Sequence, residues 1–197
     1  MKLKQYWRFL IVFFFLLCSL LLLEQTKTLT KKENAAVMLD ASTRMERALS
    51  ALKKEKQNRG YKISPIDDPN ATGMIGESYT EITTTLGSLE SKRSTTNPNT
   101  AAMVVDMLTQ CGVKQGDTVA VNLSSSFPCL NIAVLCALDA MGLKGSVMNS
   151  VGASTYGANL PDFTYLDMEH FLLEHQYLSN HSSCFSLGGQ MSSCPPR

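Results

Sequence analysis

The sequence lacks the short motifs by which metal sites and nucleotide-binding loops are usually recognised. It has no two cysteines separated by two residues, and no cysteine and histidine spacing of the kind that binds zinc. Neither a Walker A loop nor a G-x-G-x-x-G fingerprint is present, so the sequence gives nucleotide binding little support. We therefore expect no metal site and no cofactor.

The sequence also lacks the G-x-S-x-G elbow of many serine hydrolases. A nucleophilic serine needs a neighbouring base and a group that orients the base. The histidines offer no clear partner, because His170 and His175 lie in a predicted helix and His181 lies near the C-terminus. The sequence therefore assigns no catalytic residue and leaves open whether the protein is an enzyme.

Neither positive nor negative side chains are in excess, and the formal net charge is only +1. Such a balance favours neither nucleic acid nor an acidic partner, and we expect no nucleic acid. The six cysteines do not form a disulfide framework. Cys18 lies in an apolar run, while Cys184 and Cys194 have a spacing that allows a pair in an oxidising compartment. The remaining three are predicted to be small buried hydrophobic residues: Cys111, Cys129 and Cys136.

What the chain does have is an N-terminal apolar run, Phe9 to Leu23, with Lys2, Lys4 and Arg8 before it. The run of about 15 residues makes roughly 22 Å of helix, short of a bilayer core of about 30 Å. The following Glu24 and its neighbours offer no small residues for cleavage. We therefore predict an uncleaved anchor over residues 1–25, with a cleaved signal or a buried core helix as alternatives.

Residues 26–60 are predicted to be a linker followed by an amphipathic helix. Gly60 suits a left-handed stop at the end of this helix. The helix carries an apolar stripe, which is expected to pack on the following domain or on a partner helix. Its apolar residues recur at spacings of three and four: Met38, Ala41, Met45, Ala48 and Leu52.

Residues 61–179 alternate between strand-like and helical patterns. Strands are predicted at Thr118–Leu123 and Ser146–Asn149, with the apolar helix Pro128–Met141 between them. A long loop over 149–161 then leads to a helix that starts near Thr164 or Asp167 and runs to Tyr177. The fold class is therefore α/β, a partial Rossmann-like parallel βαβ domain that follows the anchor and the amphipathic helix.

The residues after Asn180 show no hydrophobic period and end in Pro195-Pro196-Arg197. We predict that residues 180–197 are irregular. Two strands also make too small a sheet to stand alone. The pattern therefore predicts a C-terminally incomplete domain with a tail that results from truncation or a frameshift.

Polar residues follow each of the two predicted strands, at the sheet edge where open parallel sheets bind ligands. Hydroxyl groups, glycine and backbone N–H groups at this edge suit an anion, and Lys92 and Arg93 are candidates for a second anion contact. The alternative is that the serines only form turns and cap the next helix. The candidate ligand-binding residues in the two turns are Ser124, Ser125, Ser126, Asn149, Ser150, Gly152, Ser154 and Thr155.

Three segments carry a resemblance to a known family. Residues 76–99 read GESYTEITTTLGSLESKRSTTNPN, residues 116–128 read GDTVAVNLSSSFP, and residues 149–159 read NSVGASTYGAN. Together they resemble the poly-gamma-glutamate system protein family of bacteria. The resemblance runs from the anchor to about Gln176, and family members are longer.

This resemblance implies a membrane-anchored accessory protein of poly-gamma-glutamate capsule synthesis or export. Its expected partners are the membrane, the poly-gamma-glutamate synthase components and the polyanionic polymer itself. The basic residues before the apolar run place the N-terminus in the cytoplasm and the bulk of this single-pass protein outside the cell membrane. Two alternatives remain open: a serine-dependent hydrolase or amide transferase that acts on the polymer, and a non-catalytic scaffold subunit of the synthase complex whose contacts are the anchor helix and the Met38–Leu52 stripe.

Overall fold

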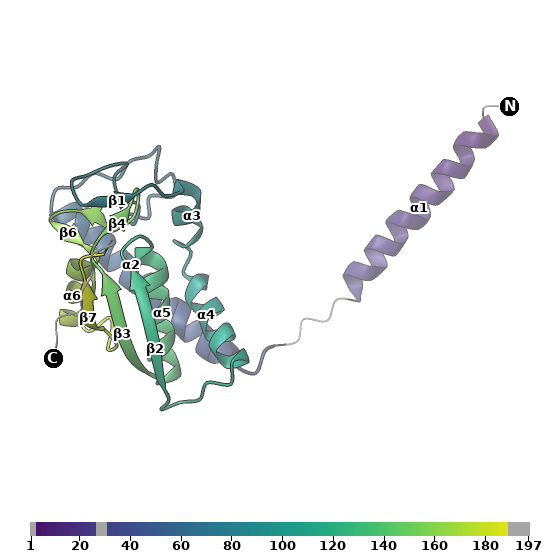
Figure 1. Cartoon of the computed structure of the whole chain (residues 1–197). Coiled ribbons are helices and arrows are strands. Elements are labelled where there is room, and N and C mark those ends of the chain that lie inside the picture. The colour runs from purple at the N-terminus through teal and green to yellow at the C-terminus, as the bar shows by residue number, and fades with distance from the viewer. Residues whose placement is uncertain (1–2, 27–30, 189–197) are drawn as a thin grey trace. The chain divides into compact units, whose positions relative to one another are not determined.

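The computed structural model describes residues 3–26 and 31–188 of the 197-residue chain. The chain divides into two compact units, residues 1–33 and residues 34–197, which Figure 1 shows in purple and in blue to yellow. The first unit holds one helix. The second is a mixed helix and strand domain that contains a parallel sheet.

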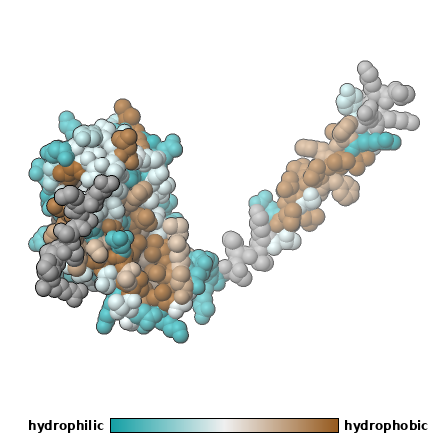
Figure 2. Space-filling view, viewed as in Figure 1, coloured by the Kyte–Doolittle hydropathy of each residue, from teal (hydrophilic) through white to brown (hydrophobic). Residues whose placement is uncertain are grey.

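Helix α1 (Leu3–Gln25) is longer than the apolar run that predicts it. Its 23 residues span roughly 35 Å, because the helix continues through Tyr6-Trp7-Arg8 before the run and Glu24-Gln25 after it. The prediction of a span shorter than the bilayer core is therefore wrong. Tyr6–Gln25 is long and apolar enough to cross a membrane, a property that signal sequences share. Figure 2 shows its largely hydrophobic surface.

Helix α2 (Ala35–Asn58) is amphipathic as predicted, and its apolar stripe belongs to the core of the domain. Met45 and Leu52 are fully buried. They face helices α4 (Asn99–Gln110) and α5 (Pro128–Met141), the two elements with which α2 makes its most extensive contacts. A partner protein cannot use this stripe while the domain is folded, so the scaffold alternative loses one of its two predicted contact surfaces and keeps the anchor helix.

The main sheet contains three parallel strands in the order β2–β3–β7. β2 (Thr118–Ser124) pairs residue by residue with β3 (Lys144–Ser150), and α5 connects them as predicted. Figure 1 shows α2 and α5 behind these strands. Alternate residues of β2 and β3 are exposed, Asn122 and Met148 among them, so the described helices cover one face of the sheet.

The third strand, β7 (Ser182–Ser186), lies in the segment predicted to be irregular, and that prediction is wrong for these five residues. The serine-rich sequence carries no strand pattern of its own. It is extended because β3 offers an unpaired edge and because neighbouring groups accept its hydrogen bonds. The Ser182 N–H and hydroxyl both bond to Glu169 Oε1, and Ser183 Oγ donates to the Val147 carbonyl. Residues 189–197, including Cys194, lie outside the described residues.

Short elements complete the domain, and one of them lies within residues 77–86, a Thr-rich segment whose composition is typical of a strand or an extended loop. β1 (Thr83–Thr85) pairs in parallel with β4 (Ala153–Ser154), and β5 (Asn159–Leu160) pairs with β6 (Phe163–Thr164). The prediction of a loop over 149–161 is therefore wrong at β4 and β5. Helix α3 (Leu89–Ser94) was not predicted.

Helix α6 (Tyr165–Glu174) begins at Thr164, one of the two predicted starts. Thr164 and Asp167 form a reciprocal capping box, which satisfies backbone N–H groups at the first turn. Cys129 and Cys136 are buried in α5 as predicted, and burial raises the pKa of the Cys136 thiol to about 12. Cys111 is exposed, because α4 ends just before it, so the prediction of burial is wrong there.

Candidate functional site

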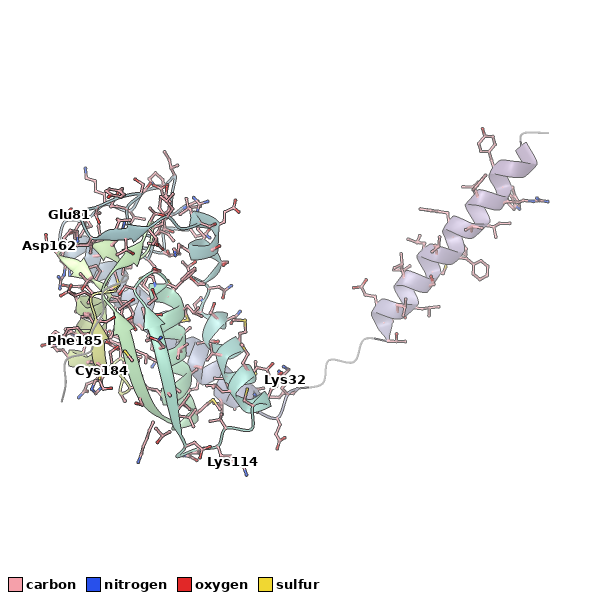
Figure 3. The ribbon with its side chains drawn as sticks, in the orientation of Figure 1. Lys32, Glu81, Lys114, Asp162, Cys184 and Phe185 are labelled. Carbon is pink, nitrogen blue, oxygen red and sulfur yellow. The ribbon has the colours of Figure 1, made fainter. Side chains whose placement is uncertain are left out.

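The two polar turns of the predicted site lie side by side at the C-terminal ends of β2 and β3. Ser124 pairs with Ser150 at the last position of the two strands. Figure 3 shows Lys114 at the end of the domain where β2 begins, while Glu81 lies at the opposite end, near β1 and β4. The two turns therefore meet at the end of the sheet at which the sequence predicts them.

Ser125 ties the two turns together and is fully buried. Its N–H and its hydroxyl both donate to the carbonyl of Ser150, and its own carbonyl accepts from the Ala158 N–H at 2.9 Å. Asn149 Nδ2 lies 3.5 Å from Ser125 Oγ. With its donors used in this way, Ser125 holds the loops in position.

Ser124 does not cap helix α5, although the sequence offers capping as the alternative role of these serines. Helix α5 begins after Phe127 without any side-chain cap, and Pro128 at its first turn needs none. Ser124 is exposed, and its Oγ accepts from the Ser126 N–H at 3.3 Å. The Ser124 carbonyl accepts from Asn131 Nδ2 at 2.8 Å, which fixes the strand end to the helix.

Lys92 points into this region from helix α3, and its side chain is buried with only 3% of the residue exposed. Its Nζ lies 2.8 Å from Ser154 Oγ and 3.5 Å from the centre of the Phe127 ring. Over the described ranges 3–26 and 31–188, no carboxylate forms an ion pair with Lys92. Burial lowers the pKa of the Lys92 amine to about 8, because the charged form loses its hydration.

Ser154 is the meeting point of the two turns and of helix α3. It lies on β4, with 4% of the residue exposed, and its N–H donates to Ser126 Oγ at 3.0 Å. Ser126 thus positions the backbone of Ser154, while Lys92 contacts its hydroxyl. We refer to Lys92, Ser126, Phe127 and Ser154 as the Lys92 site.

Close backbone packing surrounds the Lys92 site. A Cβ atom on Gly87 would lie 2.7 Å from Ser154 Oγ, and one on Gly157 would lie within about 3 Å of the Ser125 and Ser126 carbonyl oxygens. The Thr155 hydroxyl accepts from the Gly87 N–H and donates to the Gly87 carbonyl. Glycine is required where backbone approaches this closely.

The backbone is also strained next to Ser154. Tyr156 has a φ of +62°, a left-handed conformation that bulky residues rarely adopt. Its N–H donates to the Glu77 carbonyl, and its own carbonyl accepts from the Gly76 N–H, which holds it in place. Backbone strain of this kind concentrates at functional sites.

The structure separates Arg93 from the other predicted site residues. Its Nε donates to the Asp67 carbonyl at 2.8 Å and its Nη2 to the Ile66 carbonyl at 2.7 Å. These contacts secure the turn before Thr72, and they use Arg93 as a structural residue. Of the two adjacent cations, Lys92 alone contacts the strand-end residues.

Three other predicted residues have backbone or hydrogen-bonding roles. The Gly152 N–H donates to the Leu187 carbonyl, and a side chain at Gly152 would meet Thr84 Cγ2. The Ser150 carbonyl holds Ser125. Asn149 is 1% exposed, and its Oδ1 has no hydrogen-bond partner within the part of the chain that the structure describes. Such a group is an available acceptor beside Ser125.

Sequence reasoning missed Phe127, Gly87 and Asn159. The buried Asn159 side chain bonds to both the N–H and the carbonyl of Glu77 and to Thr83 Oγ1, which fixes the segment that leads to β1. Phe127 and Gly87 carry no polar side chain, so a search for chemistry-bearing residues passes over them. The one signal in the sequence was that an aromatic residue, Phe127, directly follows the three serines.

No family model, curated protein or solved structure matches this chain.

Proposed function

We propose that this protein is a single-pass membrane protein that assists poly-gamma-glutamate synthesis or export together with synthase components. The N-terminus lies in the cytoplasm and the domain outside the membrane. The proposal rests on the three resembling segments, on helix α1 and on the basic residues that precede its apolar run. In this proposal the three-stranded sheet is a partial Rossmann-like sheet that binds ligands at its C-terminal edge.

The observation that carries the binding function is the buried ammonium group of Lys92 without a paired carboxylate. Burying a charge is costly unless an opposite charge or good hydrogen bonds compensate it. A hydroxyl and an aromatic ring provide part of that compensation here. A carboxylate from outside the chain would provide the rest, and poly-gamma-glutamate presents one on every residue.

The Lys92 site has the groups that such a carboxylate needs. With a pKa of about 8, Lys92 is about nine-tenths protonated at pH 7 and can donate to a carboxylate oxygen. The Ser154 hydroxyl lies 2.8 Å from the amine, and the Ser126 hydroxyl accepts from the Ser154 N–H. Charge and hydrogen bonding together favour one carboxylate at this position.

Titration calorimetry of the detergent-solubilised protein with glutamate oligomers tests this function. We expect binding that weakens as the pH rises through 8, and a loss of at least tenfold in affinity for Lys92→Met. Lys144→Met is the matched control, because Lys144 is exposed at the start of β3, the opposite end of the sheet. Wild-type protein that shows no binding, or equal loss in both variants, would overturn the proposal.

Protease accessibility tests the topology. The protein should stay in the membrane fraction after an alkaline wash, and protease added outside the cell should digest residues from Lys31 onward. An intact soluble cytoplasmic protein would contradict the anchor. A soluble external form that starts near Lys27 would identify α1 as a cleaved signal.

A further inference from the structure

We propose that Ser154 is a nucleophile and that Lys92 is its general base in an acyl-transfer reaction. The proposal deepens the function proposed above by naming a reaction at the same site, and its chemistry requires only a carbonyl substrate. It assigns the serine-dependent alternative to Ser154 in place of the Ser124–Ser126 turn.

The amine of Lys92 and the hydroxyl of Ser154 are close enough to exchange a proton. Lys92 Nζ and Ser154 Oγ are 2.8 Å apart, within the 2.6–3.2 Å over which a general base can take the proton of a nucleophile. Serine and lysine pairs are among the recurring variants of the catalytic triad. The pair is formed by residues 62 positions apart, on helix α3 and strand β4, so it is a product of the fold and not of local sequence.

The surroundings of the Lys92 amine favour its neutral form. A lysine acts as a base only when it is neutral, and an ordinary lysine is charged at neutral pH. Burial lowers the pKa of Lys92 to about 8, and no carboxylate among the described residues pairs with it to raise the pKa again. About one-tenth of the amine is therefore neutral at pH 7, and half at pH 8.

Ser154 is held in place by its neighbours. Its N–H is held by Ser126 Oγ, and the strained Tyr156 follows two residues later. Gly87 lies over the hydroxyl with only a hydrogen atom where other residues carry Cβ. The neighbourhood therefore holds Ser154 and its hydroxyl in one position beside Lys92, as a nucleophile paired with its base requires.

The reaction proceeds in two balanced steps. Neutral Lys92 takes the proton from Ser154 Oγ as the oxygen forms a bond to the substrate carbonyl carbon. The C–N bond of the amide then breaks, and the Lys92 ammonium group returns the proton to the leaving amine, which leaves an acyl ester on Ser154. Lys92 then takes a proton from water as the water oxygen forms a bond to the ester carbonyl carbon. The bond from that carbon to Ser154 Oγ breaks, and the Lys92 ammonium group returns the proton to Oγ, so the net reaction is amide hydrolysis; an amine in place of water gives transfer.

The decisive experiment labels the full-length protein in detergent with a small fluorophosphonate reagent. Ser154 Oγ forms a bond to phosphorus, fluoride leaves, and Lys92 takes the proton. We expect one adduct that peptide mass spectrometry locates on Ser154, with a rate that rises with pH and levels off above about 8. General-base assistance contributes on the order of 10²–10⁴ to such a rate.

Variants separate this role from a structural one. Ser154→Ala should abolish the adduct, and Lys92→Met should slow labelling by at least 100-fold. Gly87→Ala should also slow it, because its Cβ would lie 2.7 Å from the nucleophile. Ser91→Ala is the matched control, since Ser91 is exposed on helix α3 next to Lys92, lies outside the Lys92 site and should leave labelling unchanged.

The outcomes decide between the proposals. Three results would each overturn the assignment of Ser154 as nucleophile and Lys92 as base. They are wild-type protein without an adduct, an adduct that survives Ser154→Ala, and a labelling rate that Lys92→Met leaves unchanged. The carboxylate function is tested separately, because Ser154→Ala keeps the Lys92 cation and should weaken the binding of glutamate oligomers less than Lys92→Met does. Binding needs charged Lys92 and weakens above pH 8, whereas labelling needs neutral Lys92 and strengthens, so the two pH profiles have opposite signs.

Discussion

The domain buries two lysines, and their surroundings differ in a way that assigns them different roles. Lys56, on α2, is 5% exposed and donates to the Ile75 carbonyl at 2.7 Å. Burial lowers its pKa, while Glu77 and Asp68 act in the opposite direction. Lys92 is as deeply buried, but its neighbours are a hydroxyl and an aromatic ring, and no acidic group offsets the effect of burial on its pKa.

The comparison shows that burial alone does not mark a functional lysine. Lys56 satisfies a backbone carbonyl and lies in a field of acidic groups, which is how proteins use a cation as a structural element. Lys92 contacts a side chain that can react or be displaced. The difference in partners supports a structural role for Lys56 and the role in binding and chemistry that we propose for Lys92.

The strongest test of the comparison reverses the charge at Lys56. Lys56→Glu places a buried carboxylate beside Glu77 and Asp68 and removes the donor to Ile75. We expect the free energy of unfolding to fall by about 3–5 kcal/mol. Urea denaturation followed by circular dichroism measures this. Lys54→Glu is the control, because Lys54 is exposed on the same helix and should change stability little; equal losses would contradict a structural role specific to Lys56.

Replacing Lys92 should raise the free energy of unfolding, whereas replacing Lys56 should lower it. Its pKa in the folded protein, about 8, lies below the ordinary value of 10.5, so the unfolded chain binds more protons between these pH values. Wild-type stability therefore rises with pH across that window. Lys92→Met removes the cost of burying the charge and should stabilise the protein by up to about 3 kcal/mol at pH 7.

The stabilisation should disappear as the pH approaches 10.5. Urea midpoints of wild type, Lys92→Met and the exposed-site control Lys144→Met, measured from pH 7 to 10.5, follow it directly. Curves that stay parallel for wild type and Lys92→Met would show that Lys92 does not titrate in this window. A variant less stable than wild type at pH 7 would show that Lys92, like Lys56, is a structural lysine.

The Lys92 site also depends on close backbone packing, which the surroundings of Lys56 do not need. Gly157→Ala brings a Cβ within about 3 Å of the Ser125 and Ser126 carbonyl oxygens and of Ser126 Cα. These are backbone atoms that cannot rotate away, so we expect a loss of about 1–3 kcal/mol in stability. Fluorophosphonate labelling should fall with it. Unchanged stability would mean that the two turns separate easily.

The smallest effect should come from the aromatic ring that distinguishes the two lysines. Phe127→Leu keeps the apolar volume but removes the cation–π contact, which is worth about 0.5–2 kcal/mol. The charged form of Lys92 loses support, so its pKa should fall by roughly one unit. Carbon-13 NMR titration of the lysine Cε resonances measures this. A pKa that stays constant would show that the ring does not stabilise the cation.

The sequence predicts those elements that carry strong periodicity. Helices α2 and α5 and strand β2 appear at or near their predicted bounds, because their apolar residues repeat at the spacing of the element they form. Elements that depend on a distant partner were missed. β7 is extended because β3 and Glu169 receive its hydrogen bonds, and β4 is two residues long beside β1.

The site was predictable in part for the same reason. Parallel strands end at one edge, so the turns at Ser124 and Ser150 had to be neighbours. The contact between Lys92 and Ser154 had no local signal, because it depends on helix α3 and strand β4, neither of which the sequence predicts. Arg93 shows the converse: adjacent cations in the sequence leave a short helix in different directions.

The uncovered face of the sheet has a consequence for the protein in water. Parallel sheets are usually shielded on both sides, and their strands then consist of unbroken apolar runs. β2 alternates instead, and its exposed positions carry Thr118, Ala120, Asn122 and Ser124. These small and polar side chains make the β2 part of that face wettable, so β2 offers a second layer of helices little apolar surface to bury, whereas Met148 on β3, which pairs with Asn122, adds a large apolar side chain that is 43% exposed.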